Sequence, residues 1–162
     1  MTERTCREYK QAGFTLIELV VVIVLLGILS ATAIPRFVNM RREAIIATMQ
    51  GLKVSLENAA TMAHAKALVE GKDAQASATI VVEGTTVNLV YGYPAGTATG
   101  ISLLLETPSG DWKQRASIYS GAWVYWHGVI NEDAGAAQCY LRFRQATAAG
   151  SRPVIDFQDS GC

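Results

Sequence analysis

Residues 13–19 read Gly-Phe-Thr-Leu-Ile-Glu-Leu, and the chain continues from there as an apolar run that ends at Ile34. Between Phe14 and Ile34 the only charged side chain is Glu18. As a helix, residues 14–34 would extend about 31 Å, close to the thickness of the hydrocarbon core of a bilayer. The stretch therefore predicts a membrane-length helix near the N-terminus, with one carboxylate just inside it.

Length and charge set the limits for the rest of the chain. The 162 residues are enough for one domain of ordinary size beyond the apolar segment. The formal net charge is zero, and no basic run is longer than Arg41-Arg42. Neither feature indicates a nucleic-acid partner.

The segment before the apolar run is short and charged. A basic segment beside an apolar one tends to stay in the cytoplasm, so we expect the remainder on the far side of the membrane. An ordinary secretory signal is cleaved after its apolar region, where Ser30–Ala33 only weakly resembles such a site. Basic residues outnumber acidic ones in this leader: Arg4, Arg7 and Lys10 against Glu3 and Glu8.

A Gly-Phe-Thr-Leu-Ile-Glu-Leu motif after a charged leader, with an apolar run ending in Ala-Ile-Pro, closely resembles the class III signal of type IV pilins and pseudopilins. The resemblance implies that a dedicated membrane peptidase cuts after Gly13 and methylates the new amino group of Phe14. Glu18 then matches the glutamate at the family's fifth mature position. Pro35 matches the proline that closes the apolar half.

Glu18 needs an explanation because a charge at the centre of a membrane helix costs about 2.5–3.5 kcal/mol on translocon scales. Glu18 lies one helical turn from Phe14, so helix geometry allows an ion pair with the mature amino group of its own chain. The resemblance implies an interchain pair instead. In that arrangement, Glu18 of an incoming subunit binds the amine of a subunit that is already assembled.

We expect one helix from Phe14 to about Val69, stopped at Gly71 and kinked at Pro35, which lacks an amide hydrogen. Beyond the proline, apolar residues recur at spacings of three and four: Ile45, Met49, Leu52, Leu56, Ala59 and Ala63. Charged residues occupy the opposite side: Arg42, Glu43, Lys53, Glu57 and Lys66. This stripe predicts packing against a sheet, with a short coiled coil as the alternative.

The C-terminal half changes from helical to strand-like patterning. Short connections favour a mostly antiparallel sheet, so the predicted fold class is α+β: a long helix packed on a β-rich head. The expected elements are a hairpin of Thr79–Glu83 and Thr86–Tyr91 about Gly84-Thr85, a loop at residues 91–97, a short helix in Ala98–Glu106, one or two strands in Ile118–Val129 broken at Ser120-Gly121, and strands in Cys139–Arg144 and Pro153–Phe157.

The three cysteines lack the close spacing of a zinc site. If Cys6 leaves with the leader, the mature chain keeps one pair, Cys139 and Cys162, outside the cytoplasm, where disulfides persist. A bridge between them matches the disulfide-bounded C-terminal region of many type IV pilins. It would contribute about 3 kcal/mol by the chain-entropy estimate.

The resulting domain organisation has four segments. Residues 1–13 form the removed leader, and 14–35 form the transmembrane and polymerisation half of the helix. Residues 36–71 form its amphipathic half, and 72–162 form the head with its C-terminal disulfide loop.

No catalytic, cofactor or metal set emerges from the sequence. The two histidines, His64 and His127, are far apart and lack metal-ligand spacing. There is no nucleophile elbow and no phosphate loop. The acids Glu132, Asp133, Asp156 and Asp159 are a weaker alternative as a calcium site. The aromatic residues between Tyr119 and Trp126 are expected to pack on the sheet, with sugar binding as the alternative.

These features predict a structural protein rather than an enzyme. It is cleaved, N-methylated and polymerised with copies of itself into an extracellular type IV pilus for adhesion, aggregation or motility, without a cofactor. Its expected partners are the prepilin peptidase and N-methyltransferase and the inner-membrane assembly machinery. The precursor is expected in the inner membrane, with a cytoplasmic leader and a periplasmic head.

Two other functions stay open. One is a pseudopilin of a type II secretion system, and the other is a membrane-anchored periplasmic enzyme or binding domain. Within the pilins, Gly92-Tyr93-Pro94 and the closing Gly161-Cys162 resemble the mannose-sensitive haemagglutinin branch.

Overall fold

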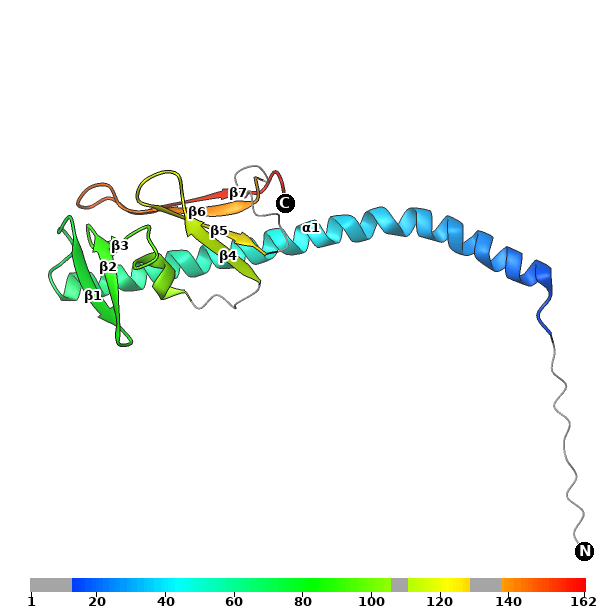
Figure 1. Cartoon of the computed structure of the whole chain (residues 1–162), viewed down its shortest axis with the longest axis horizontal. Coiled ribbons are helices and arrows are strands. Elements are labelled where there is room, and N and C mark those ends of the chain that lie inside the picture. Colours follow the sequence, from blue (N-terminus) through cyan, green and yellow to red (C-terminus); the bar gives the residue numbers. More distant parts are fainter. Residues whose placement is uncertain (1–12, 106–110, 129–137) are drawn as a thin grey trace, which may run out of the picture. The chain divides into compact units, whose positions relative to one another are not determined.

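The computed structural model describes residues 13–105, 111–128 and 138–162. The chain divides into two units, one that ends at Arg41 and one that comprises Arg42–Cys162. Helix α1 (Leu16–Val69) contributes to both, and the second unit also contains the β-strands (Figure 1). The leader residues 1–12 lie outside the described part of the chain.

The first unit consists mainly of the N-terminal half of α1. Its segment Leu16–Ile34 is long and apolar enough to cross a membrane, and none of it is buried within the chain. Two hydroxyl groups bond to the helix backbone: Ser30 Oγ donates to Leu26 O at 2.7 Å and Thr32 Oγ1 to Leu29 O at 2.9 Å. Side chains satisfied in this way suit a lipid environment, which offers no hydrogen bonds. The helix continues through Pro35, and the kink there stays a prediction.

The second unit confirms the predicted apolar stripe of α1. Four of its members are buried against the strands, namely Met49, Leu52, Leu56 and Ala63, and Ile45 and Ala59 are partly buried. Ala60 and Ala67, which the prediction did not include, are buried with them. The helix ends after Val69, where Gly71 has φ +65°. Gly71 N–H donates to Leu68 O at 3.1 Å, and Lys72 N–H donates to Ala67 O at 2.8 Å. This pair of bonds is a Schellman cap, which explains why a glycine stops the helix.

The strands of the described chain form two antiparallel sheets, as the short connections predict. One has the order β1-β2-β3 and the other β4-β5-β6-β7. The first comprises β1 (Ala78–Val82), β2 (Thr85–Val90) and β3 (Tyr93–Pro94), and a 3₁₀ helix, η1 (Ile101–Leu104), follows it. The second comprises β4 (Trp112–Ala116), β5 (Ala122–His127), β6 (Tyr140–Arg144) and β7 (Val154–Gln158).

Each sheet shares a core with a different part of α1. Nearer the start of the head, Leu56 and its neighbours on the helix pack with Tyr125, Leu141 and Phe143 of the four-stranded sheet. Nearer the helix end, the small residues Ala63 and Ala67 let β1 and β2 approach closely. Figure 1 shows the two sheets succeeding one another along the same helix. The stripe therefore packs on sheets, and not in a coiled coil, within the second unit.

Four local expectations need correction. The hairpin turns at Glu83-Gly84, one residue earlier than expected, because both residues have the positive φ of a type I′ turn, 48° and 80°. The expected loop at 91–97 contains strand β3, whose Tyr93 pairs with Val90. The short helix expected in Ala98–Glu106 is only the 3₁₀ helix η1, Ile101–Leu104. Residues 118–121 form a turn before β5, so Ser120-Gly121 precedes the strand and does not interrupt it.

Candidate functional site

The N-terminal end of α1 is capped by three hydrogen bonds between Thr15 and Glu18. Glu18 Oε2 accepts from the backbone N–H of Thr15 at 2.9 Å and from its hydroxyl at 2.8 Å. Thr15 Oγ1 in turn accepts from the backbone N–H of Glu18 at 3.3 Å. This arrangement is a capping box, which satisfies amide groups that a helix start leaves unpaired.

The capping box gives Glu18 a partner within its own chain, Thr15, which differs from the predicted partner, the amino group of Phe14. A Thr-x-x-Glu spacing immediately before an apolar run is its usual signature, and residues 15–18 have that spacing. The box places the carboxylate on the first turn of the helix, at its positive end. In the single chain, Glu18 is therefore satisfied without an amino group.

Gly13 and Phe14 precede the helix and are exposed, Phe14 to 78%. Phe14 and Glu18 line one shallow hollow together with Ile17, Val21 and Val22. The predicted cleavage point thus lies outside the helix and is exposed, and the residue that would carry the methylated amine lies on the same side of the helix start as the carboxylate. Cleavage after Gly13 and methylation of Phe14 stay predictions.

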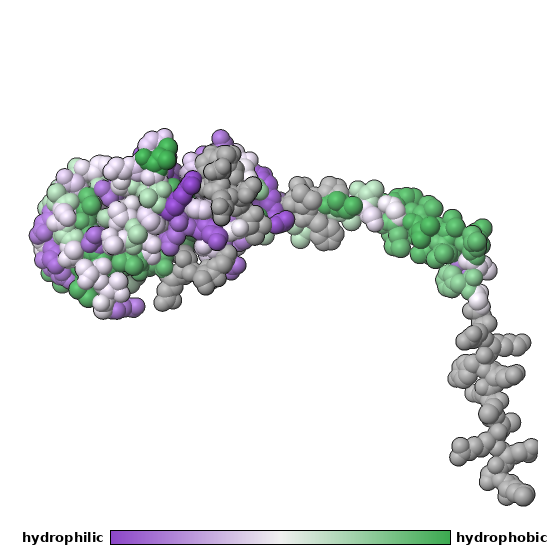
Figure 2. Space-filling view, viewed as in Figure 1, coloured by the Kyte–Doolittle hydropathy of each residue, from purple (hydrophilic) through white to green (hydrophobic). Residues whose placement is uncertain are grey.

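The apolar half of α1 presents hydrophobic side chains all round. Every residue from Leu16 to Ile34 is exposed, and from Val20 to Leu29 every residue is Val, Ile or Leu except Gly27. Figure 2 shows this stretch as an almost unbroken hydrophobic surface. A surface of this extent has to be covered by lipid or by other protein.

The C-terminal disulfide between Cys139 and Cys162 is present, as predicted. The two Cα atoms are 4.9 Å apart, and the bridge joins residues separated by 23 positions. Next to it, Gly161 N–H donates to Gln138 O at 3.1 Å, and Ser160 Oγ donates to Gln138 Oε1 at 2.7 Å. These bonds hold the chain end against the start of β6.

The Gly92-Tyr93-Pro94 segment has a packing role. Gly92 has φ +76°, and a Cβ atom there would lie 2.6 Å from Asp73 Cα, so only glycine fits. The Tyr93 ring stacks on His64 of α1 with centroids 4.0 Å apart. His64 Nδ1 lies 3.1 Å from Gly92 O. His64 is therefore part of the contact between α1 and β3.

The remaining titratable candidates do not gather into a metal site within the described residues. His127 ends β5 and meets Trp112 edge-on, with ring centroids 5.6 Å apart. Asp156 pairs with two arginines, Arg142 and Arg144. Of the other three acids of the calcium alternative, Asp159 belongs to no metal-binding group among the described residues, and Glu132 and Asp133 lie outside the described residues.

The aromatic residues between positions 119 and 126 divide between two faces of the sheet. Trp123 and Tyr125 face the core beside α1, which confirms the packing role for these two. Trp126 lies on the opposite face and is almost fully buried there. Tyr119 is exposed in the turn before β5.

Comparison with known proteins places the N-terminal region in one class. Residues 9–34 match the family model described as the prokaryotic N-terminal methylation motif. The matched segment contains the predicted cleavage point, Glu18 and the apolar part of α1. The chain is thus one with an N-terminal methylation motif that leads into a membrane-length helix.

Curated relatives narrow this class. The chain is 44% identical to the type IV narrow pilus major component PilA5 of Thermus thermophilus over 55 residues, which cover 34% of this chain and 47% of the relative. It is 41% identical to a fimbrial protein of Pseudomonas aeruginosa over 69 residues, or 43% of this chain and 42% of that protein. Both relatives are named for pili or fimbriae. Each match spans less than half the length of the relative, and no solved structure matches the chain.

Proposed function

We propose that the chain is a structural pilin subunit that polymerises through the apolar half of α1 into an extracellular type IV pilus. The observation that carries the proposal is the segment Leu16–Ile34, which has the length to span a membrane and buries nothing within the chain. The methylation motif over residues 9–34 and the relatives named for pili and fimbriae support the same role.

In this proposal, the apolar segment has two environments in succession. Before assembly it lies in the inner membrane, with the leader in the cytoplasm and the head in the periplasm. After a prepilin peptidase has cut behind Gly13 and Phe14 has been methylated, the segment packs among identical helices in the fibre. The assembly machinery of the inner membrane would drive this transfer, and the fibre would serve adhesion, aggregation or motility.

Glu18 would exchange partners during that transfer. The capping box with Thr15 satisfies the carboxylate in the single chain, where a free ion in lipid would be costly. Assembly would replace or supplement these bonds with an ion pair to the methylated amine of Phe14 in a neighbouring subunit. Charge-assisted bonds of this kind are stronger than neutral ones, which favours the assembled state.

Replacing Glu18 by Val tests the assembly role. We expect Glu18→Val to leave insertion and leader cleavage intact and to abolish filaments, because the interchain pair is lost. Thr32→Val is the matched control, since it removes a polar group of the same helix that bonds only to its own backbone. Normal filament yield from Glu18→Val would contradict the proposal.

The function itself is tested on cell surfaces. Electron microscopy with and without the gene product, followed by mass spectrometry of sheared fibres, should give peptides that begin at methylated Phe14. Short periplasmic pseudopili in place of surface fibres would support the type II secretion alternative. An intact Met1 on a membrane-bound monomer would support an anchored enzyme or binding domain. The mannose-sensitive haemagglutinin branch stays a prediction from Gly92–Pro94 and Gly161-Cys162.

A further inference from the structure

The face of the four-stranded sheet that points away from α1 carries an arginine on either side of an apolar strand position. Arg115 of β4 pairs with Val124 of β5, and Val124 pairs with Arg142 of β6. Residues paired across neighbouring strands point to the same face, so these three side chains form one row. With strands about 4.8 Å apart, the two arginine Cα atoms lie roughly 10 Å from each other.

A pocket of about 420 Å³ is lined by this row and by residues 116–119, which lead from β4 toward β5. This outer-face pocket has Val124 in its lining, arginines at two sides, and the hydroxyl-bearing residues Ser117, Tyr119 and Tyr140 around it. The volume lies within the range of small-ligand sites. Ile118, which is 93% exposed, also belongs to the lining.

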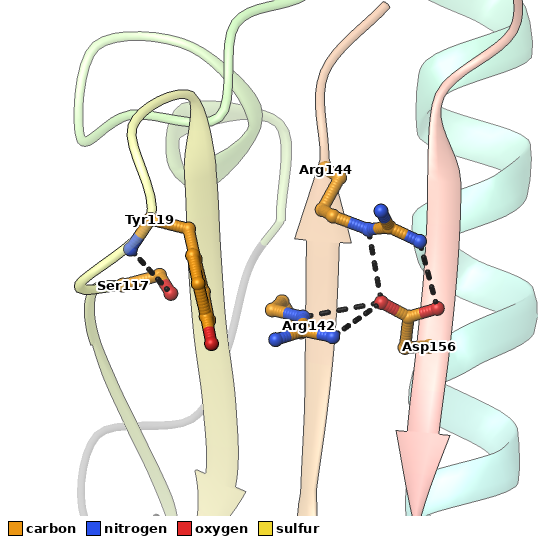
Figure 3. Close-up of polar contacts among 5 residues, drawn as sticks. All are labelled: Ser117, Tyr119, Arg142, Arg144 and Asp156. Atoms are coloured by element: carbon orange, nitrogen blue, oxygen red, sulfur yellow. Dashed lines mark hydrogen bonds and ion pairs between the residues drawn. The ribbon is translucent and has the colours of Figure 1, made fainter.

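One wall of the outer-face pocket is fixed by Asp156. Its Oδ2 accepts from Arg142 Nε at 3.1 Å and Nη2 at 2.9 Å, and its Oδ1 accepts from Arg144 Nη2 at 3.2 Å. The guanidinium carbon of Arg142 lies 5.3 Å from the centroid of the Tyr119 ring (Figure 3). The charge of Arg142 is therefore compensated, and Arg142 in turn positions the tyrosine.

The other wall is Arg115, whose guanidinium has a different environment. It lies 5.6 Å from the centroid of the Trp126 ring, and no acidic group or hydrogen-bond acceptor among residues 13–105, 111–128 and 138–162 is paired with it. A cation held over an aromatic face keeps its N–H donors available at its edge. Arg115 therefore offers these donors to an anion in the pocket.

The charge of the sheet favours such an anion. Strands β4–β7 carry four cations, Lys113, Arg115, Arg142 and Arg144, against the single anion Asp156. Because Arg142 and Arg144 share Asp156, Arg115 is the guanidinium of the outer-face pocket that has no acidic partner among the described residues. One site of this kind suits a single carboxylate, whereas a nucleic-acid backbone would call for a track of uncompensated cations.

We propose that the outer-face pocket binds a sugar residue that carries a carboxylate, such as a hexuronate unit of an acidic polysaccharide. Arg115 binds the carboxylate as a bidentate partner. Val124 and the Tyr119 ring contact the C–H face of the sugar, and the hydroxyl groups of Tyr119, Tyr140 and Ser117 bond to its hydroxyls. The inference concerns the folded head and is independent of polymerisation.

Binding is measured on the detergent-solubilised full chain by titration calorimetry with trigalacturonate. The matched ligand is the fully methyl-esterified trigalacturonate, which keeps the sugar rings and lacks the charge. We expect the ester to bind about tenfold more weakly or worse, as for loss of a charged hydrogen bond. Equal binding of both ligands, or no binding of trigalacturonate in the millimolar range, would overturn the proposal.

Two charge-removing variants on the same strand locate the site. Arg115→Gln should weaken trigalacturonate binding about tenfold or more. Lys113→Gln removes a charge from the same face two residues away, outside the pocket lining, and should change binding less than twofold. Similar losses from both variants would indicate general charge attraction and sink the proposal. Tighter binding of a short single-stranded oligothymidylate, reduced equally by both variants, would replace it with nucleic-acid binding.

Discussion

Helix α1 presents its apolar side chains in two different ways along its length. In the first unit, the segment Leu16–Ile34 is apolar on all sides apart from Glu18, Ser30 and Thr32, and all of its residues are exposed. In the head, the apolar residues follow one stripe, and this stripe is buried against two sheets. Leu25 is 55% exposed, whereas Leu56 of the same helix is fully buried.

The contrast shows that one helix can serve two separate purposes. The stripe in the head completes a core within the chain, so its contribution appears in the stability of the monomer. The all-round apolar surface has no partner within the chain, and its contribution appears only when lipid or other copies cover it. Mutations in the head half of α1 should therefore change the stability of the monomer, and mutations in the apolar half should change membrane insertion or assembly.

The largest expected effect comes from a paired truncation in the two halves. Leu56→Ala leaves a cavity between α1 and the four-stranded sheet and should lower the unfolding free energy of the head by about 2–5 kcal/mol. Leu25→Ala should change it by less than about 0.5 kcal/mol, because Leu25 is exposed and belongs to no hydrophobic core formed by the described residues. Denaturant unfolding of the detergent-solubilised chain, followed by near-ultraviolet circular dichroism, measures both. Equal losses would contradict the division between the halves.

The disulfide should have the next largest effect, and only on the head. Replacing both Cys139 and Cys162 by Ser should cost about 3 kcal/mol, since it frees the loop between two cysteines 23 positions apart in the unfolded chain. The same unfolding experiment measures this loss. Membrane insertion of the apolar half should stay as in the parent chain. Loss of insertion would mean that the two regions are coupled.

Acid should weaken the head through Asp156. Partial burial opposes ionisation of this carboxyl, but hydrogen bonds and positive charge from Arg142 and Arg144 outweigh it and lower its pKa. Because the folded pKa lies below the ordinary value near 3.9, the contribution to stability is present above that value and is lost as pH falls through the folded pKa.

The matched variant for this effect is Asp156→Asn. It should cost on the order of 1 kcal/mol at neutral pH, where the parent chain has its ion pairs. Below about pH 4 the difference between variant and parent should shrink as the parent carboxyl protonates. Thermal unfolding at a series of pH values measures it. A difference that grows as pH falls would contradict this sign.

The smallest effect is expected at Tyr125. Burial raises the pKa of its hydroxyl, and that hydroxyl has no hydrogen-bond partner among the described residues. Tyr125→Phe should therefore be neutral or stabilising by up to about 1 kcal/mol, because a buried polar group without a partner is removed. A loss above about 1 kcal/mol in the unfolding free energy would indicate a partner for the hydroxyl.

The features that the sequence predicts correctly are local or strongly periodic. They include the apolar segment, the stripe from Ile45 to Ala63, the glycine stop at Gly71 and the hairpin of β1 and β2. The disulfide between Cys139 and Cys162 is predicted correctly too, because the resemblance to pilins implies that Cys6 leaves with the leader, and one pair of cysteines remains. In each case, neighbouring residues or a count were sufficient.

The features that the sequence does not predict depend on contacts between residues far apart in the chain, or lie in segments that have no apolar pattern. Strand β4 reads Trp-Lys-Gln-Arg-Ala over residues 112–116 and lacks apolar alternation, because it is an exposed edge strand. The stack of His64 on Tyr93 joins residues 29 positions apart, and no local pattern encodes it. The row of Arg115, Val124 and Arg142 likewise needs the register of three strands. Among the missed features, only the capping box of Thr15 and Glu18 has a local sequence signature, the Thr-x-x-Glu spacing.

The disulfide also determines how the head would carry mechanical load. A pull applied at Cys162 passes through two sulfur atoms to Cys139, at the start of β6, and bypasses the chain between them. Strands β6 and β7 both lie in that bypassed segment. The two cysteines are 23 positions apart, so the fully extended segment would have lengthened the molecule by roughly 80 Å. Under tension, this part of the head keeps its length while the bridge is intact.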